Sequence, residues 1–264
     1  MTVERSAAST DGRRDELAMA LAQVRGRIRA ACTTVGRDPA EVRLLAVTKT
    51  FPARDVVLLA DLGVLDVAES REQEAAAKVA DAHVLRPSVP LRWHLVGRLQ
   101  RNKARAVASW AVQVQSVDSV RLADALDRAA RAAEEAGERD GPLGVLVQAS
   151  LDGDPSRGGC PLPELGMLAD RVAAASGLRL EGVMGVAPLG VDPGSAFAAL
   201  AEAAQRLRQE HPGAVELSAG MSGDLEQALA HGSTCVRVGT ALLGGRPIAF
   251  PLPCATDRKQ AGPG

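Results

Sequence analysis

Eight short apolar runs alternate with helix-forming stretches along this chain of 264 residues. The runs lie at 43–48, 64–68, 91–96, 112–117, 143–151, 178–186, 215–217 and 235–238. Continuous apolar runs of this length are typical of strands that are buried on both faces. Strands separated by helices are joined by right-handed parallel crossovers, and eight such units match the usual size of a (β/α)8 TIM barrel. We therefore expect one α/β domain of that architecture.

An open, doubly wound sheet is the alternative fold. It usually carries a glycine-rich turn after its first strand. Here that turn is Thr48-Lys49-Thr50-Phe51-Pro52, which has no glycine. The barrel is therefore favoured.

An extra helix is predicted before the first strand. Its apolar residues share one helical face: Leu17, Leu21, Val24, Ile28 and Cys32. We expect a flexible tail at 1–14, the barrel at 15–247 and a second flexible tail at 248–264.

Composition limits the partners and the compartment. A net charge of -1 and the lack of a basic run give no footprint for nucleic acid or an anionic membrane. We find neither a signal peptide nor an apolar run long enough to span a bilayer. The 4 cysteines form no C-x-x-C pair, which favours a reducing cytoplasm over a disulfide framework.

Lys49 follows the first apolar run closely. A lysine at the C-terminal end of a buried strand can form an imine if its surroundings lower the pKa of the amine. The alternative is a lysine whose stem packs on the protein while its amine reaches solvent.

Two loops rich in small residues follow the last two strands, at 218–224 and 237–240. In TIM barrels the corresponding loops often bind phosphate through open backbone N–H groups. Ser218, Ser222 and Thr240 add hydroxyls, and Gly239 leaves the backbone open. Ordinary turn chemistry would explain the same residues.

An amine and a phosphate site on one face predict a phosphorylated aldehyde as ligand. Pyridoxal 5′-phosphate (PLP) fits best, because it needs an imine-forming lysine, a phosphate site and a partner for its pyridine nitrogen. Arg237 can be that partner, and as a permanent donor it would keep the nitrogen unprotonated. It can equally be a phosphate ligand or a member of a structural ion pair.

Four motifs in order resemble the pyridoxal phosphate homeostasis protein family (YggS-type). They are LAVTK at 45–49, WHLVGRLQRNK at 93–103, LSAGMSGD at 217–224 and GSTCVRVGT at 232–240. The resemblance implies a barrel like the N-terminal domain of alanine racemase, with PLP as a Schiff base on Lys49. It also implies phosphate contacts from Ser218, Gly239 and Thr240, and a ring contact from Arg237.

Several positions differ from the family pattern. The family commonly has Gly-Glu-Asn-Tyr where this chain has Ala68-Glu69-Ser70-Arg71, so we expect Ser70, or a water molecule, to replace the asparagine at the cofactor. Arg157 stands where a lysine is common, and an arginine does not supply the amine that a second PLP-holding site would need.

The histidines suggest one more site residue. His94 follows Trp93 at a strand end, where it can be an acid or base or a packed histidine beside the cofactor. His83, His211 and His231 lack the spacing of metal ligands, so we expect no metal.

The function that we expect is PLP homeostasis without substantial catalysis. The protein would be a monomer that buffers PLP and hands it to apo-enzymes. One alternative is a racemase-like PLP enzyme, which would need a second base, although the chain has no tyrosine. The other is a Schiff-base aldolase that uses Lys49 without a cofactor.

Overall fold

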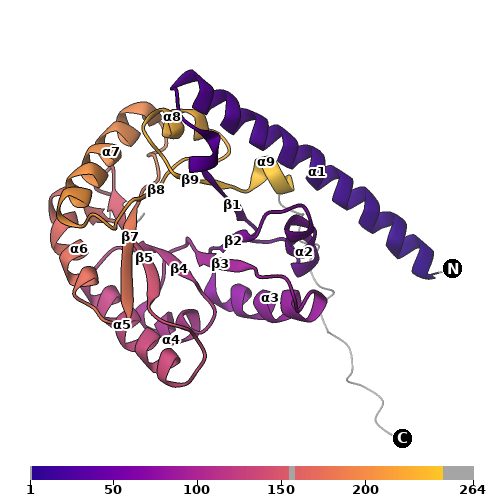
Figure 1. Cartoon of the computed structure of the whole chain (residues 1–264), viewed down its shortest axis with the longest axis horizontal. Helices are drawn as coiled ribbons and strands as arrows, with labels where there is room; N and C mark the ends of the chain where they lie inside the picture. Colours follow the sequence, from indigo (N-terminus) through magenta and orange to yellow (C-terminus); the bar gives the residue numbers. More distant parts are fainter. Residues whose placement is uncertain (1, 155–157, 246–264) are drawn as a thin grey trace, which may run out of the picture.

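Eight parallel strands close on themselves at the centre of the computed structural model, which describes residues 2–154 and 158–245 (Figure 1). Their order around the barrel is β1-β2-β3-β4-β5-β7-β8-β9, and β9 pairs with β1. The strands are β1 (Arg43–Val47), β2 (Asp66–Glu69), β3 (Arg92–Leu95), β4 (Gln113–Val117), β5 (Leu143–Ser150), β7 (Leu178–Met184), β8 (Glu216–Ser218) and β9 (Cys235–Val238). The predicted (β/α)8 barrel is confirmed.

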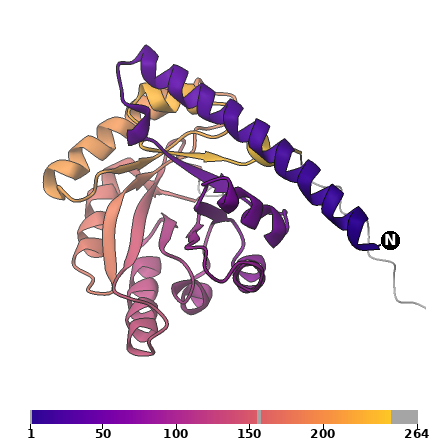
Figure 2. The same ribbon diagram turned by 45° about the vertical axis from the view of Figure 1, so that its right-hand side comes forward.

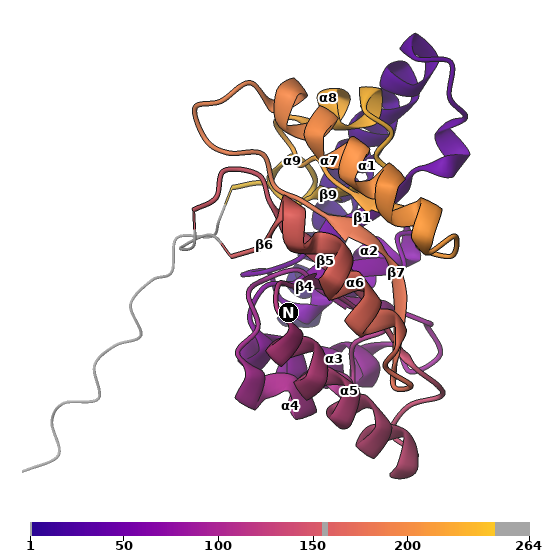
Figure 3. The ribbon, with the colours of Figure 1, turned by 90° about the vertical axis from the view of Figure 1, so that its left-hand side faces the viewer.

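Helices surround the strands on the outside of the barrel (Figures 1 and 3). They are α2 (Ala53–Asp61), α3 (Glu72–Leu85), α4 (Ala104–Ala108), α5 (Val120–Glu135), α6 (Leu165–Ala173), α7 (Pro193–Glu210), α8 (Leu225–Ala230) and α9 (Thr240–Leu243). Short 3-10 helices among the described residues include η1 (Pro39–Glu41), η2 (Arg101–Lys103) and η4 (Leu162–Glu164). A two-residue strand, β6 (Cys160–Pro161), pairs with β5 and was not predicted, because two residues carry no periodicity.

The predicted extra helix is present as α1 (Thr2–Thr34), and it crosses the outside of the barrel beside α8 and α9 (Figure 2). All five apolar residues of its predicted face are buried. However, α1 also includes most of the segment 1–14, for which a flexible tail was expected. Arg13 explains the difference in part, because its guanidinium donates to Asp55 on α2 and to the carbonyl of Leu243 on α9. The expected tail at 248–264 lies outside the described residues.

Close packing of β7 against β8 depends on one glycine. Gly182 has a φ of 153°, and a Cβ there would lie 1.8 Å from the carbonyl oxygen of Glu216. Backbone that approaches this closely tolerates no side chain.

In the part of the chain that the structure describes, no helix combines the length and hydrophobicity needed to cross a bilayer.

Candidate functional site

Lys49 lies in a tight turn immediately after β1. The N–H of Phe51 donates to the carbonyl of Thr48 at 3.1 Å, which closes the turn around Lys49 and Thr50. Thr48 is fully buried, whereas Lys49 is exposed. Within the described residues the Lys49 amine has neither a hydrogen-bond nor an ion-pair partner. The Lys49 amine is therefore accessible to solvent, while the backbone that carries it is held by the buried Thr48 and the closed turn.

The residue after Lys49 has an unusual backbone. Thr50 has a φ of 69° and is the one non-glycine residue with positive φ in the described segments. A β-branched residue in this region is an outlier, because its Cβ crowds the backbone. Such strained residues are found preferentially at functional sites, where the surrounding structure enforces them.

Strand register brings the Lys49 turn beside the loop that follows β9. Ala46 pairs with Val238, so the next residues along the two strands are also neighbours. A Cβ added to Gly239 would lie 3.3 Å from the carbonyl oxygen of Val47. The ends of β2, β1, β9 and β8 are consecutive around the rim, and they carry Ser70, Lys49, the 239–240 loop and the 218–224 loop. The amine and both expected phosphate loops thus share one edge of the barrel.

Arg237 is a buried cation on β9, beside β1. Its side chain donates to two neutral acceptors, Ser218 Oγ at 2.7 Å and the carbonyl of Gly185 at 2.8 Å. Burial lowers the pKa of the guanidinium, because desolvation disfavours the charged form. No carboxylate in the described segments forms an ion pair with it. Among the described residues its charge is therefore not balanced by a carboxylate in direct contact.

The 218–224 loop is fixed from three sides. The backbone N–H of Ala241, in α9, donates to Ser222 Oγ at 3.2 Å. Arg27 of α1 donates to the carbonyl of Ser222 at 2.9 Å. Within the loop, the N–H of Met221 donates to Asp224 Oδ1 at 2.6 Å. Ser222 thus joins the two predicted phosphate loops, while Thr240 is exposed beside it.

Ser70 and Ser218, two residues expected to contact the cofactor, differ in their burial. Ser70 is half-buried after β2, and a Cβ on Gly97 would lie 2.0 Å from its carbonyl oxygen, so the loops after β2 and β3 are in direct contact. Ser218 is fully buried, and its hydroxyl donates to Gln115 Oε1 at 2.7 Å while accepting from Arg237. Ser218 therefore orients Arg237 directly.

His94 turns towards the residues that begin the strands. Its Nδ1 is 3.0 Å from Gln113 Oε1 and its Nε2 is 3.0 Å from Asp66 Oδ1; Asp66 and Gln113 are the first residues of β2 and β4. Burial alone would raise the pKa of Asp66, but hydrogen bonds from His94 and Arg92 outweigh it and lower the pKa to about 2. The structure thus places His94 in a buried polar cluster and gives it no contact with Lys49.

A chain of hydrogen bonds links this cluster to Arg237 through the barrel interior. Gln115 Nε2 donates to Gln113 Oε1 at 2.8 Å, and Gln115 Oε1 accepts from Ser218. Gln113 Nε2 in turn donates to Glu181 and Glu216, which fixes the orientation of the Gln113 amide. Arg237 is therefore braced by polar side chains from several strands.

A buried ion pair beneath the Lys49 turn was not predicted from the sequence. Lys78 Nζ lies 2.6 Å from Glu69 Oε1 and also donates to the carbonyl of Thr48 at 2.8 Å. Lys78 resembled any other lysine of a charged helix. The available signal was its position nine residues after Glu69, on the helix that follows β2.

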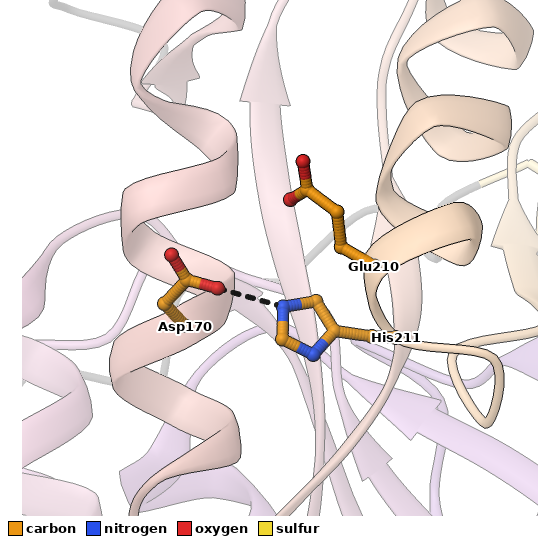
Figure 4. A group of neighbouring side chains, drawn as sticks. All are labelled: Asp170, Glu210 and His211. Carbon is orange, nitrogen blue, oxygen red and sulfur yellow. Dashed lines mark hydrogen bonds and ion pairs between the residues drawn. The ribbon is translucent and has the colours of Figure 1, made fainter.

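Three potential metal ligands meet on the outer surface, where α6 faces the end of α7 (Figure 4). His211 Nε2 is 2.9 Å from Asp170 Oδ1, and Glu210 lies beside them. Both carboxylates are exposed, and exposed acidic groups are common without an ion. A hydrogen bond between the two helices explains the arrangement.

Sequence comparison identifies the family. Residues 19–247 match the family described as "Alanine racemase, N-terminal domain". A protein of Mycobacterium tuberculosis named pyridoxal phosphate homeostasis protein is 50% identical over 90% of this chain and 96% of its own length. The chain belongs to the pyridoxal phosphate homeostasis protein family. The family assignment predicted from the four motifs is confirmed.

Solved structures support the assignment to this family. PipY of Synechococcus elongatus, whose structure contains PLP, is 34% identical with a TM-score of 0.73, over 86% of this chain and 100% of that chain. Alanine racemase from Corynebacterium glutamicum has a TM-score of 0.62 at 15% identity, over 89% of this chain and 62% of that chain. The second likeness concerns the fold alone.

Proposed function

We propose that this protein binds PLP as a Schiff base on Lys49 and serves in PLP homeostasis, holding the cofactor without substantial catalysis. The observation that best supports this proposal is the position of Lys49. Its exposed amine, which has no partner among the described residues, lies on the same edge of the barrel as Arg237 and the two loops after β8 and β9. When bound, PLP would supply an aldehyde, which condenses with a primary amine to give an imine and one water. Membership in the family and PLP in the PipY structure support the assignment.

The donor set suits each part of PLP. Arg237 would face the ring nitrogen, because a buried cation with neutral partners can still donate to an acceptor. Ser222, Gly239 and Thr240 would hold the phosphate through hydroxyl and backbone N–H groups. Ser218 would act mainly through Arg237. We leave His94 out of the proposed ligand set, since both of its ring nitrogens have partners elsewhere.

Carrier function is favoured over racemisation. A racemase of the alanine type uses a tyrosine as its second base, and this sequence contains none. His94, the candidate substitute, is enclosed with Asp66 and Gln113. A buffer or carrier needs only reversible imine formation, and transfer to apo-enzymes would follow from it. We infer a monomer in the cytoplasm, which agrees with the free, buried thiols of Cys32, Cys160 and Cys235.

The decisive experiment locates the imine. The purified protein is incubated with PLP, its near-visible absorption is recorded, and the imine is reduced with borohydride. Peptide mass spectrometry then identifies the lysine that carries the pyridoxyl group. We expect Lys49 to carry it, and Lys49→Ala to abolish the absorption band. Lys103→Ala, at another rim position, is the matched control and should keep the band.

Several experimental results would reject the proposal. A pyridoxyl group on another lysine, or an unchanged band in Lys49→Ala, would remove Lys49 from its role. Racemisation of D- or L-alanine that depends on Lys49 would replace the carrier by an enzyme. Aldol cleavage without PLP would favour the cofactor-free alternative.

A further inference from the structure

The turn that carries Lys49 rests on the buried ion pair of Glu69 and Lys78. Glu69 is fully enclosed and Lys78 is 8% exposed. Glu69 ends β2, while Lys78 lies on α3, so the pair joins the barrel wall to the helix that covers it. The pair contacts Thr48, the first residue of the turn that carries Lys49, and so it belongs to the structure that holds this turn.

Thr48 is the residue through which this pair acts on Lys49. Its N–H donates to the carbonyl of Ala68 at 2.9 Å, and its hydroxyl donates to Glu69 Oε1 at 2.6 Å. Its carbonyl accepts from Lys78 Nζ at 2.8 Å and from the Phe51 N–H that closes the turn. Backbone and side chain of Thr48 are therefore both fixed, and Lys49 is the next residue.

The arrangement of donors suggests a geometric role for the pair. Glu69 Oε1 accepts from both Thr48 and Lys78, whereas Glu69 Oε2 has no hydrogen-bond partner among the described residues. Buried ion pairs add little net stability, because desolvation offsets the attraction between the charges. A buried carboxylate with one unpaired oxygen adds even less to stability, because that oxygen has lost its water and gained no hydrogen bond. The effect of the pair is to orient Thr48, since Glu69 accepts from its hydroxyl and Lys78 donates to its carbonyl.

We propose that Glu69 and Lys78 are positioning residues that hold the Thr48–Phe51 turn so that the Lys49 amine points into the cofactor site. The proposal deepens the proposed function and rests on it, because it presumes that Lys49 captures PLP. Without the pair the turn would be closed by a single backbone hydrogen bond, and the strained φ of Thr50 would favour its opening. The amine would then sample orientations in which it does not meet the aldehyde.

The test replaces both charges together, so that no charge is left buried and unpaired. Glu69→Gln with Lys78→Met preserves side-chain length and an acceptor for the Thr48 hydroxyl. We expect this double variant to fold, to carry PLP on Lys49, and to form the imine roughly tenfold more slowly, as the loss of a charge-assisted hydrogen bond predicts. The induced circular dichroism of the bound cofactor should also fall, a signal that a purely structural role would not change.

A matched control removes an ion pair elsewhere on the barrel wall. Asp124→Asn with Arg171→Met breaks the 2.7 Å pair between α5 and α6 and should leave both the rate and the dichroism as in the unmodified protein. Thr48→Val is the second test, needed if the first double variant does not fold. It removes only the hydroxyl that Glu69 holds and should slow imine formation roughly threefold, a smaller loss because Lys78 still donates to the Thr48 carbonyl.

Two results separate the failure of this inference from the failure of the proposed function. If the unmodified protein forms no imine on Lys49, the proposed function itself fails. If the unmodified protein forms it, and the folded Glu69/Lys78 variant or Thr48→Val matches it in rate and dichroism, the positioning role is overturned. A pyridoxyl group found on Lys78 in the unmodified protein would overturn it as well.

Discussion

Thr50 offers a direct test of backbone strain beside the proposed site. Its φ of 69° lies in the left-handed region, which costs an L-residue about 1–2 kcal/mol. Glycine removes that cost but loses about 0.5–1 kcal/mol through the greater freedom of the unfolded chain. Since the Thr50 side chain is exposed, little packing is lost. Thr50→Gly should therefore stabilise the fold by up to about 1.5 kcal/mol, which corresponds to a Tm increase of up to about 6 °C for a domain of this size.

The assay is urea unfolding at neutral pH, together with the rate of imine formation. Thr50→Asn should fall between Thr50→Gly and the unmodified protein, because asparagine tolerates this region better than threonine does. Thr50→Val keeps the β-branch and should give no gain. The glycine variant should also capture PLP at least as fast as the unmodified protein, since it removes the strain that favours opening of the turn. A loss of stability in Thr50→Gly would show that the threonine is not strained, and the reasoning would be refuted.

Two further predictions concern the barrel interior. The pKa of Asp66 falls from 3.8 to about 2 on folding, so its ionised form contributes about 2 kcal/mol that is fully present above about pH 4 and is lost as the pH falls towards about 2. Urea unfolding of Asp66→Asn should show that deficit at neutral pH and a shrinking difference in acid; a difference independent of pH would contradict it. Arg237→Met should weaken PLP binding about 10- to 100-fold in an absorption titration, the usual value of a hydrogen bond from a charged donor. An unchanged Kd would place the guanidinium away from the ligand.

Most of the barrel was predictable because its strands are continuous apolar runs separated by helices. The run before Lys49 and the short run at Cys235–Val238 both matched observed strands closely. The first turns of α1 were missed, because a polar segment gives no apolar stripe, and their anchoring by Arg13 depends on residues distant in the sequence. Periodicity reports local structure and carries no information on such contacts.

The relative placement of the candidate loops was predictable, and the directions of their side chains were less so. Strand ends indicated where Lys49, Arg237 and the 218–224 loop would meet. The direction of His94 was not readable, because both its ring nitrogens find partners on neighbouring strands. The burial of Lys78 was also hidden, since a lysine on a charged helix is usually solvated. Its ion pair with Glu69 depends on how α3 packs against β2, which a periodicity in the sequence does not report.

The pairing of β1 with β9 has a consequence for when this protein becomes competent. Lys49 lies on the β1 side of this pairing, and Arg237 and the 239–240 loop lie on the β9 side, almost 190 residues later. On the proposed function, a nascent chain that has not yet delivered β9 would carry the lysine without the residues that we propose to bind the rest of the ligand. The cofactor would then bind only after β9 has been synthesised and the barrel has closed. Once bound, it would link residues from the first and the last strand of the barrel.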